Sequence, residues 1–367
     1  MKIRKTIIPV LQPYGDAQEV DAIKEVIESG WWGKGPKVTQ FEQEFAELVG
    51  SKYAIAVTSN SHGQDLIMKA MGFKGVDVIN PTMSFATTAV VPLWNDCTSN
   101  IVDVLPDTMC IDPSDVTKYK KSNSEVLIAV NFNGTPAPID EIRKVFGGFI
   151  IEDCAHSCYT EGAGTKGDVA VWSFQAVKSM PTGDGGMITL NDKELYEKMS
   201  NMIWFGIEPT WKRFTDKGYA WDYDITTLGY KYYMIDLIAA LGLSQLKRLP
   251  DLIDKRQYIQ KVYNERLHEN IQRPEWSEVC QYYSCRVNSN YRNELIDYLA
   301  EKNIHTSVHF KPLHLHPLLK QNRKYPVADV EWKKMITLPC YYNMSDNDLE
   351  YVIYWVNKFV EKNDLYT

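Results

Sequence analysis

Apolar positions along the chain alternate between helical and strand spacing. Val20, Ile23 and Val26 recur at helical spacing behind Asp16 and stop before Gly30, which predicts an N-terminal helix. A second helical pattern ends at Gly50, and the apolar run YAIAV follows as a short buried strand. The same alternation predicts further helices at 62–71, 84–93 and 138–145, and further strands at 76–80, 100–103, 126–130 and FIIED.

This interleaving of strands and helices predicts an α/β domain with a largely parallel sheet. The strand VAVWSF at 169–174 leads into a glycine-rich turn, and GMITL at 186–190 is predicted as its hairpin partner. Ligands of such sheets bind beyond the carboxyl ends of the strands. We therefore look for functional residues where the predicted strands end.

The pattern changes near residue 235, where apolar positions outline a long helix that is bent or interrupted at Pro250. We place the domain change here, with a large domain at 1–248 and a smaller C-terminal α/β domain at 249–367. The small domain is predicted to contain the helix RNELIDYLAEKN, the short strand HTSVHF and the closing helix DLEYVIYWVNKFVEK.

Composition narrows the class of protein. The 367 residues are 44% hydrophobic and 24% charged, as expected of a folded globular enzyme, and the net charge of -7 offers no basic surface for nucleic acid. We expect neither a signal peptide nor a transmembrane segment, because the apolar runs are too short. Seven scattered cysteines indicate reduced thiols, so a cytoplasmic protein is expected. From the charge and the short apolar runs we expect neither a nucleic-acid nor a membrane partner.

The strongest chemical signal lies between residues 151 and 190. Asp153 closes the strand FII, and Lys178 follows the strand VWSF in a turn before TGDGG. A lysine amine can form a Schiff base where its pKa is lowered, and a buried carboxylate can keep a pyridine nitrogen protonated. The pair therefore suits pyridoxal phosphate. Taken singly, Asp153 as a helix cap and Lys178 as a surface turn residue are equally good interpretations.

The segment TSNSHGQ at 58–64 is a candidate phosphate cradle, because a strand ends there and a helix begins. Backbone amides and the helix dipole favour a phosphate at such a point. Ser59 and Ser61 add hydroxyl donors, and Ser173 could reach the same phosphate from the sheet. The alternative for Ser59 or Ser61 is an ordinary helix N-cap.

With these residues in view, the chain resembles the DegT/DnrJ/EryC1/StrS family of sugar aminotransferases. The resemblance extends over nearly the whole length, in SGWWGKGPKVTQFEQEFAELVG, YAIAVTSNS, NPTMSFATTA, IEDCAHS, GDVAVWSFQAVKSMPTGDGG, LGYKYYMIDLIAALGLSQLKRL, KPLH and ITLPCY. It implies a fold-type I transferase that depends on pyridoxal 5'-phosphate (PLP) and is related in architecture to aspartate aminotransferase. It also implies a homodimer whose active sites share residues across the interface.

The resemblance assigns roles to individual residues. It implies that Lys178 carries the cofactor and moves the proton, that Asp153 pairs with the ring nitrogen, that His156 lies beside the ring's phenolic oxygen, and that Phe85 covers the ring face. The remaining cofactor-binding residues that it implies surround the phosphate: Ser59, Asn60, Ser61 and Ser173. Core packing is the alternative for Phe85, and a satisfied histidine at a helix start is the alternative for His156.

Two positions depart from the family pattern. Many members read Ser-Gly-Thr where this chain has Ser59-Asn60-Ser61, which keeps the hydroxyls and changes the backbone freedom of the middle residue. An Asn that reaches the cofactor phosphate of the neighbouring subunit in the family is Lys231 here. A lysine could meet that phosphate as a charge.

The resemblance implies a two-step transfer. An amino acid, expected to be glutamate, would convert PLP to pyridoxamine 5'-phosphate, which would aminate a 3- or 4-keto-6-deoxy nucleotide sugar in amino-sugar or surface-polysaccharide biosynthesis. The alternatives are a sugar dehydratase of the same fold, a branch that has His at the position of Lys178, and a non-catalytic scaffold or regulator. The intact Asp153, His156 and Lys178 argue against both.

Two motifs are interpreted as incidental. Gly162, Gly164 and Gly167 match the letters of the dinucleotide fingerprint, but a strand follows where the fingerprint needs a helix, so we predict a loop. The histidines of HFKPLHLHP have no carboxylate or cysteine at ligand spacing, so a structural or sugar-site role is expected and no metal site.

Overall fold

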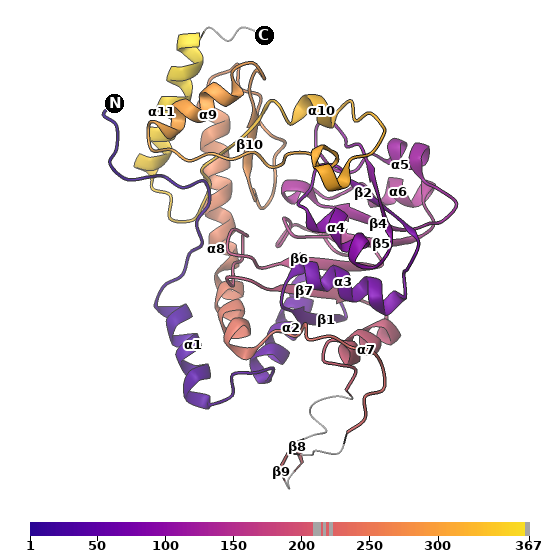
Figure 1. Ribbon diagram of the computed structural model, residues 1–367. Helices are drawn as coiled ribbons and strands as arrows, with labels where there is room; N and C mark the ends of the chain where they lie inside the picture. Colours follow the sequence, from indigo (N-terminus) through magenta and orange to yellow (C-terminus); the bar gives the residue numbers. More distant parts are fainter. Residues whose placement is uncertain (208–213, 216–217, 220–222, 364–367) are drawn as a thin grey trace.

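The computed structural model describes residues 1–207, 214–215, 218–219 and 223–363. A seven-stranded sheet forms the centre of the molecule, in the order β1-β7-β6-β5-β4-β2-β3 (Figure 1). Its strands are β1 (Tyr53–Val57), β2 (Asp77–Pro81), β3 (Thr98–Val102), β4 (Ser124–Val130), β5 (Phe149–Asp153), β6 (Val169–Ser173) and β7 (Gly186–Leu190). Every strand of the parallel part that we predicted from the sequence is present.

The sheet is parallel except at β7, which pairs antiparallel with both β6 and β1. The predicted hairpin of β6 and β7 is therefore confirmed, and its register places Ser173 opposite Gly186. Asp153 is paired with Val171, so the end of β5 lies beside β6 just before the turn that contains Lys178. The topology thus brings the predicted carboxylate and the predicted lysine to one edge of the sheet.

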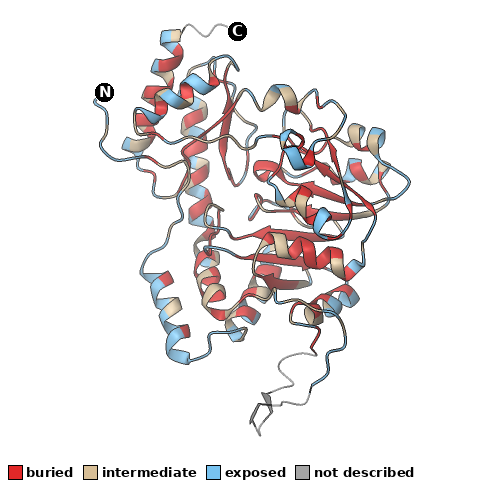
Figure 2. Cartoon of the chain, in the orientation of Figure 1, coloured by how far each residue is buried: buried red, intermediate tan, exposed pale blue. Residues whose placement is uncertain are grey.

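Alternate residues of the strands face two different helix layers, because side chains of a strand point to opposite faces in turn. Val171 packs in the layer of α3 (Asn60–Met71), α4 (Thr87–Trp94) and α7 (Lys193–Met202). Trp172 packs on the other face, against α2 (Pro36–Val49) and α8 (Asp236–Arg266). On that face, α5 (Pro113–Tyr119) and α6 (Ile139–Val145) cover β4 and its neighbours. Both faces are covered, and the strands of this sheet are buried except near the starts of β1, β3, β4 and β5 (Figure 2).

The first helix, α1 (Ala17–Ser29), begins and ends where the sequence predicted. Asp16 accepts a hydrogen bond from the backbone of Gln18, and Glu19 reaches back to the Asp16 backbone, which completes a capping box. Gly30 ends the helix in the left-handed conformation, at φ 70°. The helices α5, which opens on Pro113, and α7 were not predicted, and neither was the single helical turn at 328–331.

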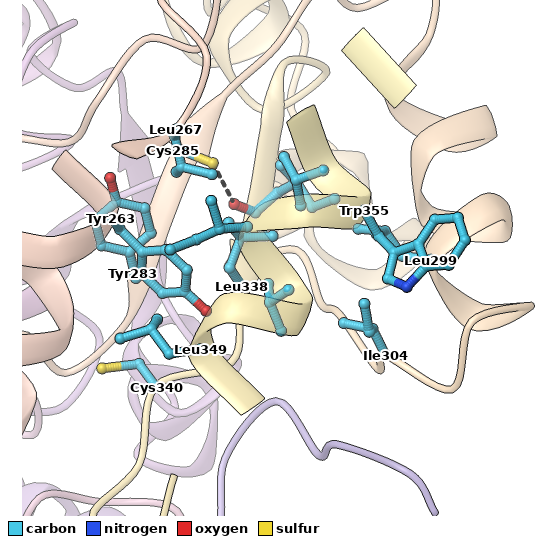
Figure 3. Close-up of a cluster of buried hydrophobic side chains, with 14 of the residues drawn as sticks. Tyr263, Leu267, Tyr283, Cys285, Leu299, Ile304, Leu338, Cys340, Leu349 and Trp355 are labelled. Carbon is cyan, nitrogen blue, oxygen red and sulfur yellow. Dashed lines mark hydrogen bonds between the residues drawn. The ribbon is translucent and has the colours of Figure 1, made fainter. Parts of the chain in front are cut away.

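The long helix α8 runs without interruption from Asp236 to Arg266 with Pro250 inside it, so it is not broken at the predicted domain change. Its second half packs in a separate core with β10 (Tyr283–Arg286), β11 (Met335–Leu338), α9 (Arg292–Ala300) and α11 (Asp346–Asn363); Figure 3 shows this cluster. A short α10 (Ala328–Glu331), the single turns Phe132–Gly134, Leu313–Leu315 and Pro317–Leu319, and the hairpin β8 (Phe214–Thr215) and β9 (Gly218–Tyr219) complete the described elements.

Two details of the smaller domain differ from the prediction. The segment HTSVHF is not a strand: it makes one bridge, between Ser307 and Thr337, while β10 and β11 form the two-stranded sheet. The N-terminal residues, which the predicted division places in the large domain, pack against the C-terminal part of the chain. Ile8 lies in its core and bridges Ile304, because the chain starts beside α11 before it crosses to α1 (Figure 1).

Among the residues described, no helix has the length and the apolar composition needed to span a lipid bilayer.

Candidate active site

Asp153 lies at the carboxyl end of β5 with only 4% of its surface exposed. Its Oδ1 accepts hydrogen bonds from the Asn60 side chain at 3.0 Å and from the Ala155 backbone at 3.1 Å. Its Oδ2 accepts one from the Gln64 side chain at 2.9 Å. Burial raises the pKa of this carboxyl, and the three donors together with the charge of Lys178 oppose that rise. Asp153 is therefore a buried, oriented acceptor and not a helix cap.

Lys178 lies in the turn that connects β6 to β7. Its backbone N–H donates to Gln175, and Ala176 donates to Gly183, so the turn closes on itself. The side chain is partly buried, and this burial lowers the pKa of the amine to about 8, against the raising effect of the Asp153 charge. The two groups influence each other's charge, and each follows the carboxyl end of one of two paired strands, β5 and β6. A lowered amine pKa is the property that Schiff-base chemistry requires.

The predicted phosphate cradle forms the N-terminus of α3. Ser59 is the N-cap and accepts a hydrogen bond from the His62 backbone, so the N-cap interpretation holds for this side chain. Ser61 shares a hydrogen bond with Thr87 at 2.7 Å, and Ser173 lies nearly buried on β6. A Cβ on Gly186 would come within 2.7 Å of the Asn60 backbone nitrogen, so this glycine lets β7 pass directly beneath the helix end.

Asn60 differs from its predicted place at the phosphate. Its side chain turns inward and donates to Asp153 and to the Val171 carbonyl, at 3.0 and 3.3 Å. The side-chain amide is therefore used at the carboxylate, and only the backbone of Asn60 remains at the start of the helix. Ser59, Ser61 and Ser173 stay predicted phosphate ligands.

His156 is buried and both of its ring nitrogens have partners. The backbone N–H of Asn133 donates to Nδ1 at 3.3 Å, and the Tyr282 hydroxyl lies 3.1 Å from Nε2. Burial and the nearby charge of Lys178 hold the pKa of His156 well below its usual range, so the ring is neutral. The observed bonds therefore agree with the alternative interpretation, a histidine whose ring nitrogens both have partners within the protein. The position of His156 beside the phenolic oxygen of the cofactor stays a prediction.

Phe85 is 63% exposed, which excludes core packing as its role. Its ring lies 6.3 Å from that of Phe310, which in turn stacks with His156 at 6.0 Å. The exposed ring therefore belongs to the same group of aromatic side chains as His156. An exposed aromatic face is suited to cover a planar ligand.

Lys231 is exposed and forms a bridge with Trp204. The adjacent Tyr232 accepts a backbone hydrogen bond from Thr58 at 2.8 Å and stacks on His62, so this segment lies against the start of α3. The predicted contact of Lys231 with a phosphate of a second subunit remains a prediction.

Gln64 and Tyr282 of this site were not predicted from the sequence, and His309 was expected only to have a structural or sugar-site role. Gln64 stood within the quoted TSNSHGQ segment, but nothing in its spacing pointed to Asp153. His309 stacks on Tyr282 at 3.9 Å, and burial and the charge of Lys178 lower its pKa to about 3. Both come from the smaller domain, far along the chain from His156.

The two motifs interpreted as incidental have structural roles. The loop with Gly164 and Gly167 wraps around the buried Glu152, whose carboxylate accepts their backbone N–H groups at 2.8 and 3.1 Å. The predicted loop is therefore confirmed. His314 bridges Thr82 at the end of β2 and Asp329 of α10, at 2.6 and 3.0 Å, and is separate from His309.

These residues fit pyridoxal phosphate. The chain offers an amine of lowered pKa and a buried carboxylate at one edge of the sheet, a helix N-terminus with hydroxyl side chains, and an exposed aromatic ring. The helix end suits the phosphate, and the carboxylate suits a protonated ring nitrogen.

The fold and the site together define a fold-type I transferase of the PLP-dependent kind. A family model described as the DegT/DnrJ/EryC1/StrS aminotransferase family matches residues 13–357. The chain belongs to this family, and its class of enzyme is therefore the aminotransferases.

Relatives match over almost their whole length. The spore coat polysaccharide biosynthesis protein SpsC of Bacillus subtilis is 34% identical, over 98% of this chain and 99% of that protein. The structure of the aminotransferase TlmJ from Streptoalloteichus hindustanus is similar with a TM-score of 0.91 at 27% identity, over 98% of this chain and 100% of TlmJ. The PLP-form of Spr1654 from Streptococcus pneumoniae, a proposed sugar aminotransferase, gives 0.89 at 26%, over 98% and 100%.

Proposed function

We propose that this enzyme transfers an amino group from an amino acid, expected to be glutamate, to a nucleotide-linked keto-sugar, with PLP held at Lys178. The observation that carries the proposal is the electrostatic interaction of Lys178 with the buried Asp153 at the carboxyl ends of the paired strands β5 and β6, in a chain of this aminotransferase family. The relation to SpsC supports a role in the biosynthesis of a surface polysaccharide.

Each residue would contribute through its own chemistry. When bound, the cofactor supplies the electron sink that makes the amino-bearing carbon acidic. The Lys178 amine would hold the cofactor and then move the proton, because its lowered pKa leaves much of it neutral near pH 8. Asp153 would keep the ring nitrogen protonated, and Phe85 would cover the ring. The exposed Lys231 would meet a phosphate across the interface of a homodimer.

The two alternative functions predict different behaviour of Lys178. A sugar dehydratase of this fold would not need a lysine there, and a scaffold would not need an amine of lowered pKa opposite a buried carboxylate. Since both features are present, transamination is the function we favour.

The test is a two-step incubation. The PLP-loaded protein is first treated with glutamate until the visible cofactor band disappears, and then with a panel of 3-keto and 4-keto nucleotide sugars. We expect one class of sugar to restore the band. Lys178→Ala should abolish both steps, while Lys166→Ala, at an exposed lysine paired with Asp140, should support both. Full turnover by Lys178→Ala would overturn the proposal.

A further inference from the structure

Two neighbouring amides of α3 hold the Asp153 carboxylate from the side of the helix. Asn60 Nδ2 donates to Oδ1 at 3.0 Å, and Gln64 Nε2 donates to Oδ2 at 2.9 Å. The two residues are one helical turn apart and are linked by a hydrogen bond from Gln64 Nε2 to Asn60 Oδ1, at 2.8 Å. Each carboxylate oxygen thus receives one side-chain amide from the same helix.

The surroundings determine which way both amides point. Asn60 Nδ2 lies between the Asp153 carboxylate and the Val171 carbonyl, and these two groups can only accept hydrogen bonds. The nitrogen of Asn60 must therefore face them, which leaves its oxygen as the acceptor for Gln64. A reversed Gln64 would set its oxygen against a carboxylate oxygen. The direction of donation toward Asp153 follows from these contacts.

Burial of the Gln64 side chain at this position is energetically unfavourable. Gln64 is fully buried, and it follows Gly63, where an added Cβ would come within 2.8 Å of Val171 on the sheet. Its Oε1 is buried and has no hydrogen-bond partner among the residues that the structure describes. An apolar residue would avoid this cost, since an unsatisfied buried acceptor is unfavourable. What Gln64 provides in return is the hydrogen bond to Asp153.

The charge of Asp153 depends on few groups. Among the residues that the structure describes, the titratable groups that act on it or respond to its charge are Lys178, Cys154 and Tyr282. Of these three, Lys178 is the cation, and binding PLP would consume its amine. Among the described protein groups, the amides of Asn60 and Gln64 and the Ala155 N–H then remain to favour the ionised carboxylate, together with the ring nitrogen that Asp153 would face.

We propose that Asn60 and Gln64 are positioning residues, which hold the Asp153 carboxylate ionised and aimed at the ring nitrogen of the cofactor. They act through Asp153 and need not touch cofactor or substrate themselves. This inference rests on the proposed function, because that function supplies the ring that Asp153 faces.

The test is the titration of Asp153 in the cofactor-free protein. Its carboxyl carbon is followed by NMR in protein labelled with ¹³C-aspartate and is identified by its loss in Asp153→Asn. Gln64→Met keeps the length of the side chain and removes the donor. We expect its titration midpoint to rise by about one pH unit, a tenfold change in the protonation equilibrium. The PLP dissociation constant should rise by roughly the same factor.

Gln245→Met is the matched control. Gln245 is buried on α8, donates to Tyr14 and Glu19, and likewise has an Oε1 without a described partner. This change should cost a similar amount of stability and leave the Asp153 midpoint where it is in the wild type. Asn60→Ala, which removes the other amide, gives the same test if Gln64→Met does not fold.

The Asp153 midpoint tests the role of Asn60 and Gln64, whereas PLP binding by the wild-type protein tests the proposed function. An unchanged Asp153 midpoint in a folded variant would overturn the inference and leave the Lys178→Ala result standing. A shifted midpoint with unchanged PLP affinity would overturn the positioning role. A wild-type protein that binds no PLP would overturn the proposed function, whatever the titration shows.

Discussion

The Tyr282 hydroxyl lies 3.1 Å from Nε2 of His156, which connects the smaller domain to the turn after β5. Because the Asn133 backbone donates to Nδ1, the neutral ring carries its proton on Nε2 and donates it to the tyrosine oxygen. Tyr282 is in turn stacked on His309. The orientation of His156 therefore depends on a residue 126 positions later in the chain.

Removing this hydroxyl should disturb His156. Tyr282→Phe leaves a buried N–H without its acceptor, so we expect a loss of about 1–3 kcal/mol in the free energy of unfolding. Tyr283→Phe is the matched control, because its buried hydroxyl donates to Asn264 at 2.7 Å, away from the site. Denaturant unfolding should show losses of this order in both variants, whereas steady-state kinetics should show reduced kcat only for Tyr282→Phe. Equal kcat values in the two variants would show that Tyr282 serves packing alone.

The Lys178 amine should control the pH dependence of cofactor binding. Its pKa is lowered to about 8, and only the neutral amine attacks an aldehyde. The rate of PLP binding to the cofactor-free protein should therefore rise with pH up to about 8 and level off above it. The measurement is the growth of the visible cofactor band after mixing.

The same measurement on the Asp153→Asn variant tests whether the charge of Asp153 raises the pKa of Lys178. The charge of Asp153 raises the pKa of Lys178, so its removal should move the midpoint of the rate profile to lower pH. A midpoint that stays at the wild-type value would show that the charge of Asp153 does not influence the pKa of Lys178.

Gly186 should be intolerant of a side chain. The added Cβ of Gly186→Ala would meet backbone atoms of Ser59 and Asn60 at 2.7 Å and push the start of α3 away from β7. We expect a loss of about 1–3 kcal/mol in the free energy of unfolding, together with weaker PLP binding. Gly147→Ala, where a Cβ meets nothing within 4 Å, should change the unfolding free energy by less than about 0.5 kcal/mol. Unaltered PLP affinity in Gly186→Ala would argue against a phosphate at this helix end.

Phe85 should matter for binding and not for folding. With 63% of its surface exposed, Phe85→Ala is expected to change the unfolding free energy by less than about 0.5 kcal/mol. The PLP dissociation constant should nevertheless rise about three- to tenfold, as for the loss of one aromatic stacking contact. The buried Phe45 gives the opposite pattern, since Phe45→Ala should cost about 3–5 kcal/mol. Calorimetry and PLP titration of both variants check the contrast.

Local patterns were sufficient to predict most of the large domain. Asp16 and Gly30 bound a helix through contacts within a few residues, and the apolar strands are recognisable because both faces of the sheet are covered. The smaller domain was harder. The strands β10 and β11 are four residues each and form a sheet of only two strands, and the predicted strand HTSVHF makes a single bridge.

The sequence by itself determined which chemistry this protein carries, because Asp153 and Lys178 each follow a recognisable strand and parallel topology brings strand ends to one edge. Only the tertiary structure decided how that chemistry is held. Asn60 and Gln64 reach Asp153 across about ninety residues of chain, and Tyr282 reaches His156 from the other domain. Such contacts have no period or spacing in the sequence, since they depend on how α3 and the smaller domain pack against the sheet.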